Sequence, residues 1–280
     1  MPKPYSVKLQ YLVPKIALTA LAGKLAHLRA GWLTTTVIRW FAKHYRVNML
    51  EAVNPDITSY ASFNDFFTRA LKPGARPLAD AAQLCPVDGA ISQFGRIDKD
   101  QIFQAKGHQY STTALLAGNA QMAREYENGY FATIYLSPRD YHRIHMPCDG
   151  KLLSMTYVPG DLFSVNPLTA EHVPGLFARN ERVVCEFANS EGKFALVLVG
   201  ATIVGSMATV WHGIVNPPRR GEIQTWHYHD QDIRLKQGEE MGRFLLGSTV
   251  VVLYPETAQL SFQPGWHPLR AVSLGEAMAQ

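Results

Sequence analysis

The sequence predicts an α+β fold, in which N-terminal amphipathic helices are followed by a mostly antiparallel, β-rich body. Two observations carry this prediction. The first fifty residues have apolar side chains at helical spacing, and from Pro86 onward short runs of Val, Ile and aromatic residues are separated by Gly and Pro. With 280 residues, of which 47% are hydrophobic and 18% charged, the chain can enclose a sizeable core.

The N-terminal region is expected to form two helices. In the first, leucines recur at spacings of three and four residues, which places them on one helical face. Pro14 stands near its start and Gly31 just past its end, as is typical of helix boundaries. The second helix has a similar spacing, with tryptophans nearby. The residues concerned are Leu18, Leu21, Leu25 and Leu28 in the first helix, and Ile38, Phe41, Tyr45, Trp32 and Trp40 in or near the second.

The net charge of +4 hides an uneven distribution. Residues 1–50 contain eight Lys and Arg and no Asp or Glu, so the other 230 residues carry 19 basic against 23 acidic side chains, a net charge of −4. Such a segment fits a helix pair lying on an anionic membrane, where each cation contributes roughly 1 kcal/mol. Ordinary core helices are the alternative. Nucleic acid is disfavoured, because the basic residues alternate with Leu and Ile and do not cluster.

The length of the uncharged segments and the cysteine pattern limit the cellular compartments in which the protein could fold. The longest uncharged N-terminal stretches, Ile16–Gly23 and Ala30–Ile38, are far shorter than the ~20 apolar residues that cross a bilayer. Lys24 follows the first stretch at once, which argues against a signal peptide. The three cysteines lack Cys-x-x-Cys spacing, which argues against a disulfide framework or a zinc ribbon. We therefore expect a protein of a reducing compartment.

Local signals predict the remaining elements. Residues 62–71 are expected to be helical, because Ser62 and Asp65 are spaced as a capping box and Lys72-Pro73-Gly74 would end the helix. A second helix is expected around residues 114–126. The predicted strands are Phe131–Leu136, Lys151–Val158, Arg182–Phe187, Lys193–Val204, Met207–Trp211, Thr249–Tyr254 and Gln259–Phe262.

Few residues indicate chemistry on their own. Leu246-Gly247-Ser248-Thr249 begins a predicted strand, but Gly205-Ser206 is a second Gly-Ser pair, and such a start is usually only a strand. Asp88-Gly89 alone is typical of a turn. A lone histidine such as His145 is commonly a hydrogen-bonded structural residue.

Two groups of histidines could instead be interpreted as metal ligands. His142, His145 and Cys148 have ligand-like spacing, but a fourth ligand is not evident. His227 and His229 would share one face of a strand, where an exposed polar face is the simpler interpretation. We expect no metal site from either grouping.

Several motifs, taken together and in order, resemble one enzyme family over nearly the whole chain. The two most specific are Leu246-Gly247-Ser248-Thr249 and Asp140-Tyr141-His142-Arg143-Ile144-His145. With the others they make the chain similar to the bacterial-type phosphatidylserine decarboxylases. The remaining motifs are Pro86-Val87-Asp88-Gly89, Lys106-Gly107-His108, Tyr157-Val158-Pro159-Gly160-Asp161-Leu162-Phe163-Ser164-Val165-Asn166, Ala178-Arg179-Asn180-Glu181-Arg182 and Met241-Gly242-Arg243-Phe244.

The resemblance implies a proenzyme that cuts itself between Gly247 and Ser248. In this family a serine hydroxyl attacks the preceding carbonyl, and the serine becomes a covalent pyruvoyl group. His145 matches the family's base and Asp88 the carboxylate that orients it, so the implied catalytic residues are Asp88, His145 and Ser248. His142 is an additional candidate for proton transfer during decarboxylation.

The resemblance also implies the products and partners. The pyruvoyl group would form a Schiff base with phosphatidylserine, release CO₂ and leave phosphatidylethanolamine, with no metal or soluble cofactor. Residues 1–50 would be the membrane-associating region, 51–247 the rest of the larger chain with the catalytic body, and 248–280 the smaller chain. These two products would form a heterodimer, peripheral on the cytoplasmic face of the cell membrane, and further dimerisation is left open. Ser164 and Asn166 are weak candidates for binding the headgroup.

Two other classes of function remain open from the residues alone. One is a serine hydrolase that uses Ser248, His145 and Asp88 without self-cleavage, although no Gly-x-Ser-x-Gly motif surrounds Ser248. The other is a lipid-binding protein that has kept the fold and lost the chemistry. All motif residues are present, and this favours the decarboxylase.

Overall fold

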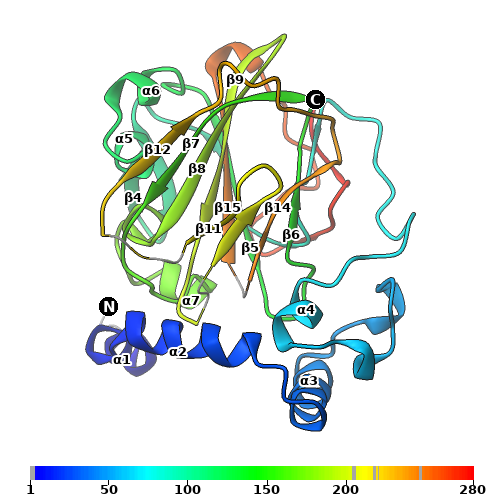
Figure 1. Ribbon diagram of the computed structural model, residues 1–280. Helices are drawn as coiled ribbons and strands as arrows, with labels where there is room; N and C mark the ends of the chain where they lie inside the picture. Colours follow the sequence, from blue (N-terminus) through cyan, green and yellow to red (C-terminus); the bar gives the residue numbers. More distant parts are fainter. Residues whose placement is uncertain (1–3, 204–205, 217–218, 220, 246–247) are drawn as a thin grey trace.

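The structure, a computed structural model, describes residues 4–203, 206–216, 219, 221–245 and 248–280. Helices come first and strands dominate the rest, so the predicted α+β fold is confirmed (Figure 1). Three helices lie along one edge of the molecule, beneath two antiparallel sheets. They are α1 (Tyr5–Leu12), α2 (Lys15–His27) and α3 (Trp32–Tyr45), followed by the short helices η1 (Met49–Glu51) and η2 (Ile57–Ser59).

The N-terminal helices differ from the expectation in number and boundaries. A separate helix, α1, precedes the two that the leucine spacing predicts. Pro14 is the N-cap of α2, which agrees with its predicted position near the start. Gly31 does not end the first helix. It is the N-cap of α3, with a φ of +55° that favours glycine, whereas α2 has already ended at His27.

The larger sheet has nine strands and holds the C-terminal segment at its centre. Along the sheet the order is β12-β7-β8-β9-β15-β5-β2-β16, and β13 also pairs with β7. Every pairing is antiparallel. The strands are β2 (Gly89–Arg96), β5 (Tyr130–Leu136), β7 (Gly150–Val158), β8 (Arg182–Asn189), β9 (Gly192–Val199), β12 (Gln224–His227), β13 (Arg234–Leu235), β15 (Ser248–Tyr254) and β16 (Ala271–Val272).

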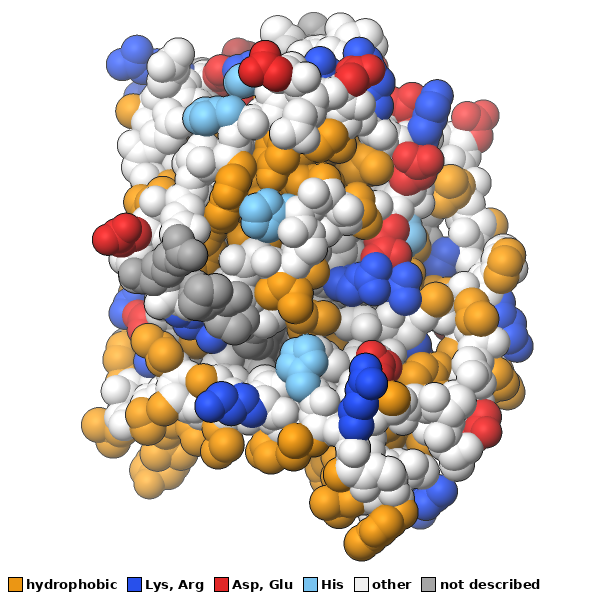
Figure 2. Space-filling model, in the orientation of Figure 1, with side chains coloured by type: hydrophobic (Ala, Val, Ile, Leu, Met, Phe, Trp, Pro, Cys, Tyr) orange, Lys and Arg blue, Asp and Glu red, His pale blue; other side chains and the backbone are white. Residues whose placement is uncertain are grey.

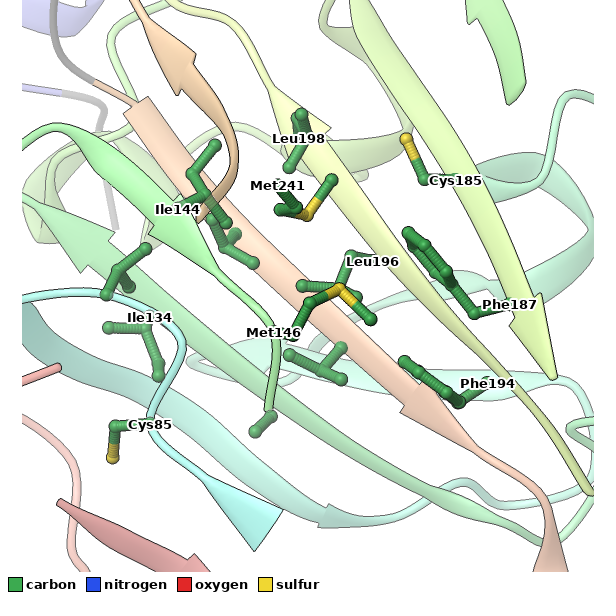
Figure 3. Close-up of a cluster of buried hydrophobic side chains, with 14 of the residues drawn as sticks. Cys85, Ile134, Ile144, Met146, Cys185, Phe187, Phe194, Leu196, Leu198 and Met241 are labelled. Atoms are coloured by element: carbon green, nitrogen blue, oxygen red, sulfur yellow. The ribbon is translucent and has the colours of Figure 1, made fainter. Parts of the chain in front are cut away.

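A smaller, four-stranded sheet packs on one face of the larger one. Its order is β11-β10-β14-β6, with β6 (Arg143–His145), β10 (Met207–Thr209), β11 (Gly213–Asn216) and β14 (Glu240–Phe244). Side chains from both sheets form a common core, in which Ile144 and Met241 lie near Leu196 and Leu198 (Figure 3). Burying this apolar surface fixes the position of β6, which carries the Arg-Ile-His end of the Asp-Tyr-His-Arg-Ile-His motif.

A second core lies on the other face of the larger sheet. There Val251 and Leu253 of β15 pack with Val197 of β9 and with buried residues of the N-terminal helices, such as Ile38. Alternate residues of β15 thus serve both cores, as strand geometry requires. The elements outside the two sheets are α4 (Phe63–Phe67), α5 (Thr112–Leu115), α6 (Ala120–Arg124), α7 (Pro167–Ala170), α8 (Leu176–Arg179), η3 (Glu256–Ala258), and the strand pairs β1 (Gln83–Leu84) with β17 (Ala277–Ala279) and β3 (Gln101–Ala105) with β4 (His108–Ser111).

Both predicted helices of the body are shorter than expected. The Ser62 side chain accepts a hydrogen bond from the backbone N–H of Asp65, so the predicted cap is confirmed. However, α4 ends at Phe67, after which Leu71 bridges to Ala52. The helix expected over 114–126 is split into α5 and α6, because the chain between them takes left-handed backbone angles, including a φ of +82° at Gly118.

Three predicted strands also change. Met207–Trp211 ends at Thr209, where the chain turns into the β10–β11 hairpin, and the strand predicted from Lys193 ends at Val199. Gln259–Phe262 is not a strand. Its first residue has a φ of +47°, and its last makes only an isolated bridge to Ala279.

The helices α1 to α3 present an apolar surface to solvent. Hydrophobic side chains gather along the lower edge of the molecule in Figure 2, over these three helices. The four leucines of the predicted face are exposed at 42–55%, so they are not core residues. The exposed set includes Leu9, Leu12, Ile16, Leu18, Leu21, Leu25, Leu28, Trp32, Leu33, Val37 and Trp40. Within the described part of the chain, every helix is too short or too polar to cross a bilayer.

Candidate active site

Ser248 is the first residue of β15 and is paired on one side with Leu136 of β5. Only 1% of the residue is exposed, and its Oγ has no hydrogen-bond partner among the described residues. A buried hydroxyl without a partner is costly, so such an atom needs an explanation. Gly247, the other half of the predicted cleavage site, lies outside the described residues.

An apolar cleft of about 200 Å³ adjoins Ser248. Helices α3 and α4 contribute aromatic side chains to it, and three loops complete its walls. Ser164, a candidate for headgroup binding, lines this cleft. The other candidate, Asn166, uses its side-chain oxygen to cap α7 at the N–H of Thr169. The lining residues are Phe41, Tyr45, Phe67, Tyr135, Leu136, Pro138, Ser164, Val165, Ala201, Thr202, Ile203 and Ser248.

His142 lies behind a wall of this cleft. Its ring stacks on Phe67, with centroids 4.1 Å apart, and its Nε2–H donates to the carbonyl of Ser137 at 3.1 Å. The other ring nitrogen, Nδ1, is buried and has no partner among the described residues. Burial, helped by the positive charge of Arg69, lowers the pKa of His142 to about 3. The ring is therefore neutral at pH 7 and keeps a free lone pair.

His145 is held at both ring nitrogens. Nδ1 lies 2.8 Å from the carbonyl oxygen of Gly238, so Nδ1 carries the proton and donates it. Nε2 must then accept from the hydroxyl of Tyr141, 3.1 Å away. Burial lowers the pKa of His145, so this ring too is neutral at pH 7 and suited to accept a proton.

Asp88 is bound to a guanidinium and to the C-terminal segment. Its carboxylate accepts from Arg76, with Nη2 2.6 Å from Oδ2, and from the backbone N–H of Leu274 at 2.8 Å. The predicted catalytic residues thus lie on three separate elements. Among the described residues, no hydrogen bond joins Asp88, His145 and Ser248, and their roles stay predictions.

Three residues of the site were not predicted from the sequence. They are Phe67, which covers His142, Tyr141, which donates to His145, and Arg76, which holds Asp88. Tyr141 is itself part of the Asp140–His145 motif, but the sequence assigned it no role. Phe67 and Arg76 come from distant segments, and nothing local in the sequence connects them to the site.

The metal-site alternatives gain no support from the geometry. Within the described ranges, no three His, Cys, Asp or Glu side chains come together as a metal-binding group. The thiol of Cys148 is buried and accepts from the side-chain amide of Asn189 at 3.6 Å. His227 and His229 stack with centroids 5.9 Å apart, although β12 ends at His227.

Comparisons with known proteins identify the family of this chain. A family model described as "Phosphatidylserine decarboxylase" matches residues 63–280, and a second, described as "PSD", matches residues 5–46. A protein of Methylobacillus flagellatus, named "Phosphatidylserine decarboxylase proenzyme", is 99% identical over 280 residues, all of both chains. Proteins with the same name from Dechloromonas aromatica and Methylibium petroleiphilum are 70% and 69% identical, over 96% and 98% of this chain and 95% and 96% of their own.

A buried serine beside an apolar cleft, with a buried, neutral histidine behind the cleft wall, is an arrangement typical of an enzyme active site. The chain belongs to the phosphatidylserine decarboxylase family. The family predicted from the motifs is confirmed, and nothing in the comparisons favours a serine hydrolase.

Proposed function

We propose that the chain is a self-cleaving proenzyme that decarboxylates phosphatidylserine through a pyruvoyl group made from Ser248. The observation that carries this proposal is the Oγ of Ser248, which is buried, lacks a partner among the described residues, and begins a strand beside an apolar cleft. A serine with a purely structural role would be expected to satisfy its hydroxyl.

Self-cleavage would proceed by an acyl shift at the bond between residues 247 and 248. The Oγ of Ser248 loses its proton to a base and attacks the carbonyl carbon of Gly247. The C–N bond breaks, and the nitrogen of residue 248 becomes a free amine on an ester-linked chain. Loss of the Cα proton then breaks the Cβ–Oγ bond, leaving a carboxylate on Gly247 and dehydroalanine at 248. Water converts dehydroalanine to pyruvoyl and releases ammonia.

His145 and Asp88 are proposed as the base and its orienting carboxylate. The neutral ring of His145 supports this role, because it can accept a proton at pH 7. For the base to act, Nε2 must exchange the hydroxyl of Tyr141 for that of Ser248. For Asp88 to orient the ring, the Nδ1–H must move from the carbonyl of Gly238 to this carboxylate, which must loosen its contact with Arg76. Apo geometry often tightens only in the reacting state, so these partners do not oppose the roles.

His142 is proposed to handle a proton in the later decarboxylation. Its Nε2–H is fixed on the carbonyl of Ser137, whose neighbour Leu136 is the register partner of Ser248. The ring, with its free Nδ1, is therefore held behind the part of the cleft wall that Phe67 forms. A neutral, buried ring with one free nitrogen can take up and return a proton in the absence of bulk water.

The two cleavage products, 1–247 and 248–280, are proposed to stay together as a heterodimer. β15 pairs with β5 and β9 on its two sides, and β16 and β17 pair with β2 and β1 of the upstream product. Val250, Val252 and Leu253 are fully buried, and each could contribute about 1.5–3 kcal/mol. Residue 248 is thus held in place by a strand after the preceding bond is broken.

The keto group of a pyruvoyl at position 248 would supply the electron sink that decarboxylation of an amino-acid headgroup requires. The chain supplies the surroundings. The aromatic side chains of Phe41, Tyr45 and Phe67 give the cleft an apolar lining, and Ser164 offers a polar group on its wall. An apolar site favours loss of CO₂, because the charged carboxylate is less stable there than its neutral product.

Residues 1–50 are proposed to bind an anionic membrane on the cytoplasmic face. The support is the apolar surface of α1 to α3 (Figure 2), together with eight cations and no acidic residue in this segment. Phe41 and Tyr45 of α3 also line the cleft at Ser248. The same helix would therefore meet the lipid and border the reaction site.

The proposal is tested by covalent trapping. Purified protein incubated with phosphatidylserine and sodium borohydride should acquire a lipid on the fragment that begins at residue 248. Protein with Ser248→Ala should acquire none, and phosphatidylcholine, which lacks a primary amine, serves as the lipid control. Lipid attached to the fragment that ends at residue 247, or to the alanine variant, would refute the assignment of residue 248.

A further inference from the structure

A second hollow, of about 230 Å³, lies next to the apolar cleft and differs from it in character. Charged side chains line it, from the end of α3, the segment after α4 and the loop after β5. We call it the arginine cavity. Its charged residues are Arg46, Arg69, Arg76, Arg139, Glu51, Asp88 and Asp140.

Arg69 is the unusual member of the arginine cavity. The residue is only 5% exposed, and its Nε is buried without a partner among the described residues. Its Nη2 donates to the backbone carbonyl of Arg139 at 3.3 Å, and its guanidinium lies 5.6 Å from the ring centroid of Phe66. Neither contact supplies a negative charge. Burial lowers the pKa of Arg69, and the carboxylates of Asp88, Glu51 and Asp140 offset this only in part, from beyond ion-pair distance. An anion in the cavity would relieve the remaining cost of burying this cation.

The carboxylates of the cavity already have other partners. Arg76 holds both Asp88 at 2.6 Å and Glu51 at 2.8 Å, and Asp140 lies 3.7 Å from Arg139 and accepts from the N–H of Ser137. Four arginines face three carboxylates, a net charge of +1. Among the described residues, neither Arg46 nor Arg69 has a carboxylate oxygen within 4.0 Å, so the surplus positive charge falls on these two arginines.

Three chain segments border both hollows. In each segment one residue lines the apolar cleft and a residue one or two positions later lines the arginine cavity. These pairs are Tyr45 and Arg46, Phe67 and Arg69, and Pro138 and Arg139. The cavity therefore lies beside the cleft at Ser248, across a shared wall. In a phospholipid whose headgroup amine is at residue 248, the phosphodiester is only a few bonds further on.

We propose that the arginine cavity is an oxyanion site for a phosphate group, with Arg69 as its central donor and Arg46 as a second. The ligand it would take is the phosphodiester of the lipid headgroup. This assignment deepens the proposed function and rests on it. The volume of the arginine cavity leaves room for a phosphate group and bound water, since one water occupies about 30 Å³ in the liquid. A guanidinium fork fits phosphate geometry well.

Binding is tested first on the uncleaved chain, so that the result does not depend on self-processing. In the Ser248→Ala protein, inorganic phosphate should show ³¹P line broadening that saturates with concentration. Adding Arg69→Met should weaken the apparent affinity about ten- to hundredfold, and Arg69→Lys should weaken it less. Arg46→Met should also weaken it, and this exposed residue keeps the test valid if Arg69→Met does not fold. Arg234→Met, an exposed arginine of β13, is the matched control.

Kinetics on processed enzyme then identify the source of the phosphate. Arg69→Met and Arg46→Met should raise KM for phosphatidylserine in mixed micelles by more than they lower kcat, and inorganic phosphate should compete with the lipid. If the variants bind inorganic phosphate more weakly but keep the wild-type KM for phosphatidylserine, the headgroup assignment is overturned and the cavity is a site for free phosphate. Phosphate binding that neither variant changes would overturn the site itself. A wild-type chain that neither cleaves nor decarboxylates, yet binds phosphate through Arg69, would instead refute the proposed function.

Discussion

Arg76 binds both carboxylate oxygens of Asp88, with Nε 2.9 Å from Oδ1 and Nη2 2.6 Å from Oδ2. The same guanidinium holds Glu51, and Asp88 also accepts from the N–H of Leu274. This network joins the segment after α3 to both sides of the predicted cleavage point, because Leu274 belongs to the fragment that follows it. If the chain is cut there, Asp88 would help to bind the two products together, in addition to its proposed role with His145.

Replacement of Arg76 by Met should destabilise the fold and slow self-cleavage. Asp88 would keep a largely buried negative charge without its cation, at a cost of about 1–3 kcal/mol. The free energy of unfolding can be measured by urea titration in the Ser248→Ala background, where the chain stays single. Arg96→Met is the matched control, since Arg96 and Glu256 are mostly exposed and should contribute under about 1 kcal/mol. Equal losses in the two variants would contradict the network.

Protonation of His142 should destabilise the folded chain at low pH. Its pKa is about 3 in the folded chain, against 6.5 for an ordinary histidine, so the unfolded chain takes up the proton first. The stability that the neutral ring provides is present above pH 6.5 and is lost as pH falls toward 3, by at most about 1.4 kcal/mol per pH unit. The substitution His142→Gln removes this pH-dependent contribution to stability. The parent's unfolding free energy minus the variant's should therefore decrease as the pH is lowered from 6.5 to 3. A difference that does not change with pH would disprove the buried, neutral ring.

The exposed leucines of α2 should contribute to membrane binding and little to folding. Leu18→Ser, Leu21→Ser and Leu25→Ser should each weaken binding to anionic vesicles about three- to tenfold. Sedimentation with vesicles of defined anionic content measures this directly. Leu269→Ser, at an exposed site far along the chain, is the control. Point variants are preferable to deletion of residues 1–50, because Val7, Ala26 and Ile38 are buried in the second core.

Ser248→Ala should abolish self-cleavage, because it removes the hydroxyl that begins the acyl shift. Ser206→Ala is the matched control, since residues 205–206 form the other Gly-Ser pair in the chain. That variant should cleave like the parent. Gel electrophoresis after purification distinguishes the two outcomes. Cleavage in Ser248→Ala, or its loss in Ser206→Ala, would assign the nucleophile to another residue.

Local patterns were sufficient to predict the order of helices and strands. The continuous run of apolar, β-favouring residues in 250–254 predicted a strand, and β15 lies at the centre of the larger sheet. The same patterns failed where backbone angles decide the structure, as at Gly118, which divides the helix expected over 114–126, and at Gln259, which prevents a strand. These are left-handed positions that periodicity does not reveal.

The site was predicted only in part, because its partners come from distant segments. The motifs gave Ser248, His142, His145 and Asp88 as candidates. The contacts that position them, such as Phe67 on His142 and Arg76 on Asp88, join residues 75 and 12 positions apart in sequence. No spacing rule links such pairs, since the fold alone brings them together.

Denaturing mass spectrometry of the purified wild-type protein tests the central claim most directly. The proposal predicts two species in place of the 31.2 kDa chain. One would contain residues 1–247. The other would contain residues 248–280, with a pyruvoyl group in place of the N-terminal serine and therefore no free α-amine. A single intact chain, or a 248–280 fragment that begins with an ordinary serine, would contradict the account.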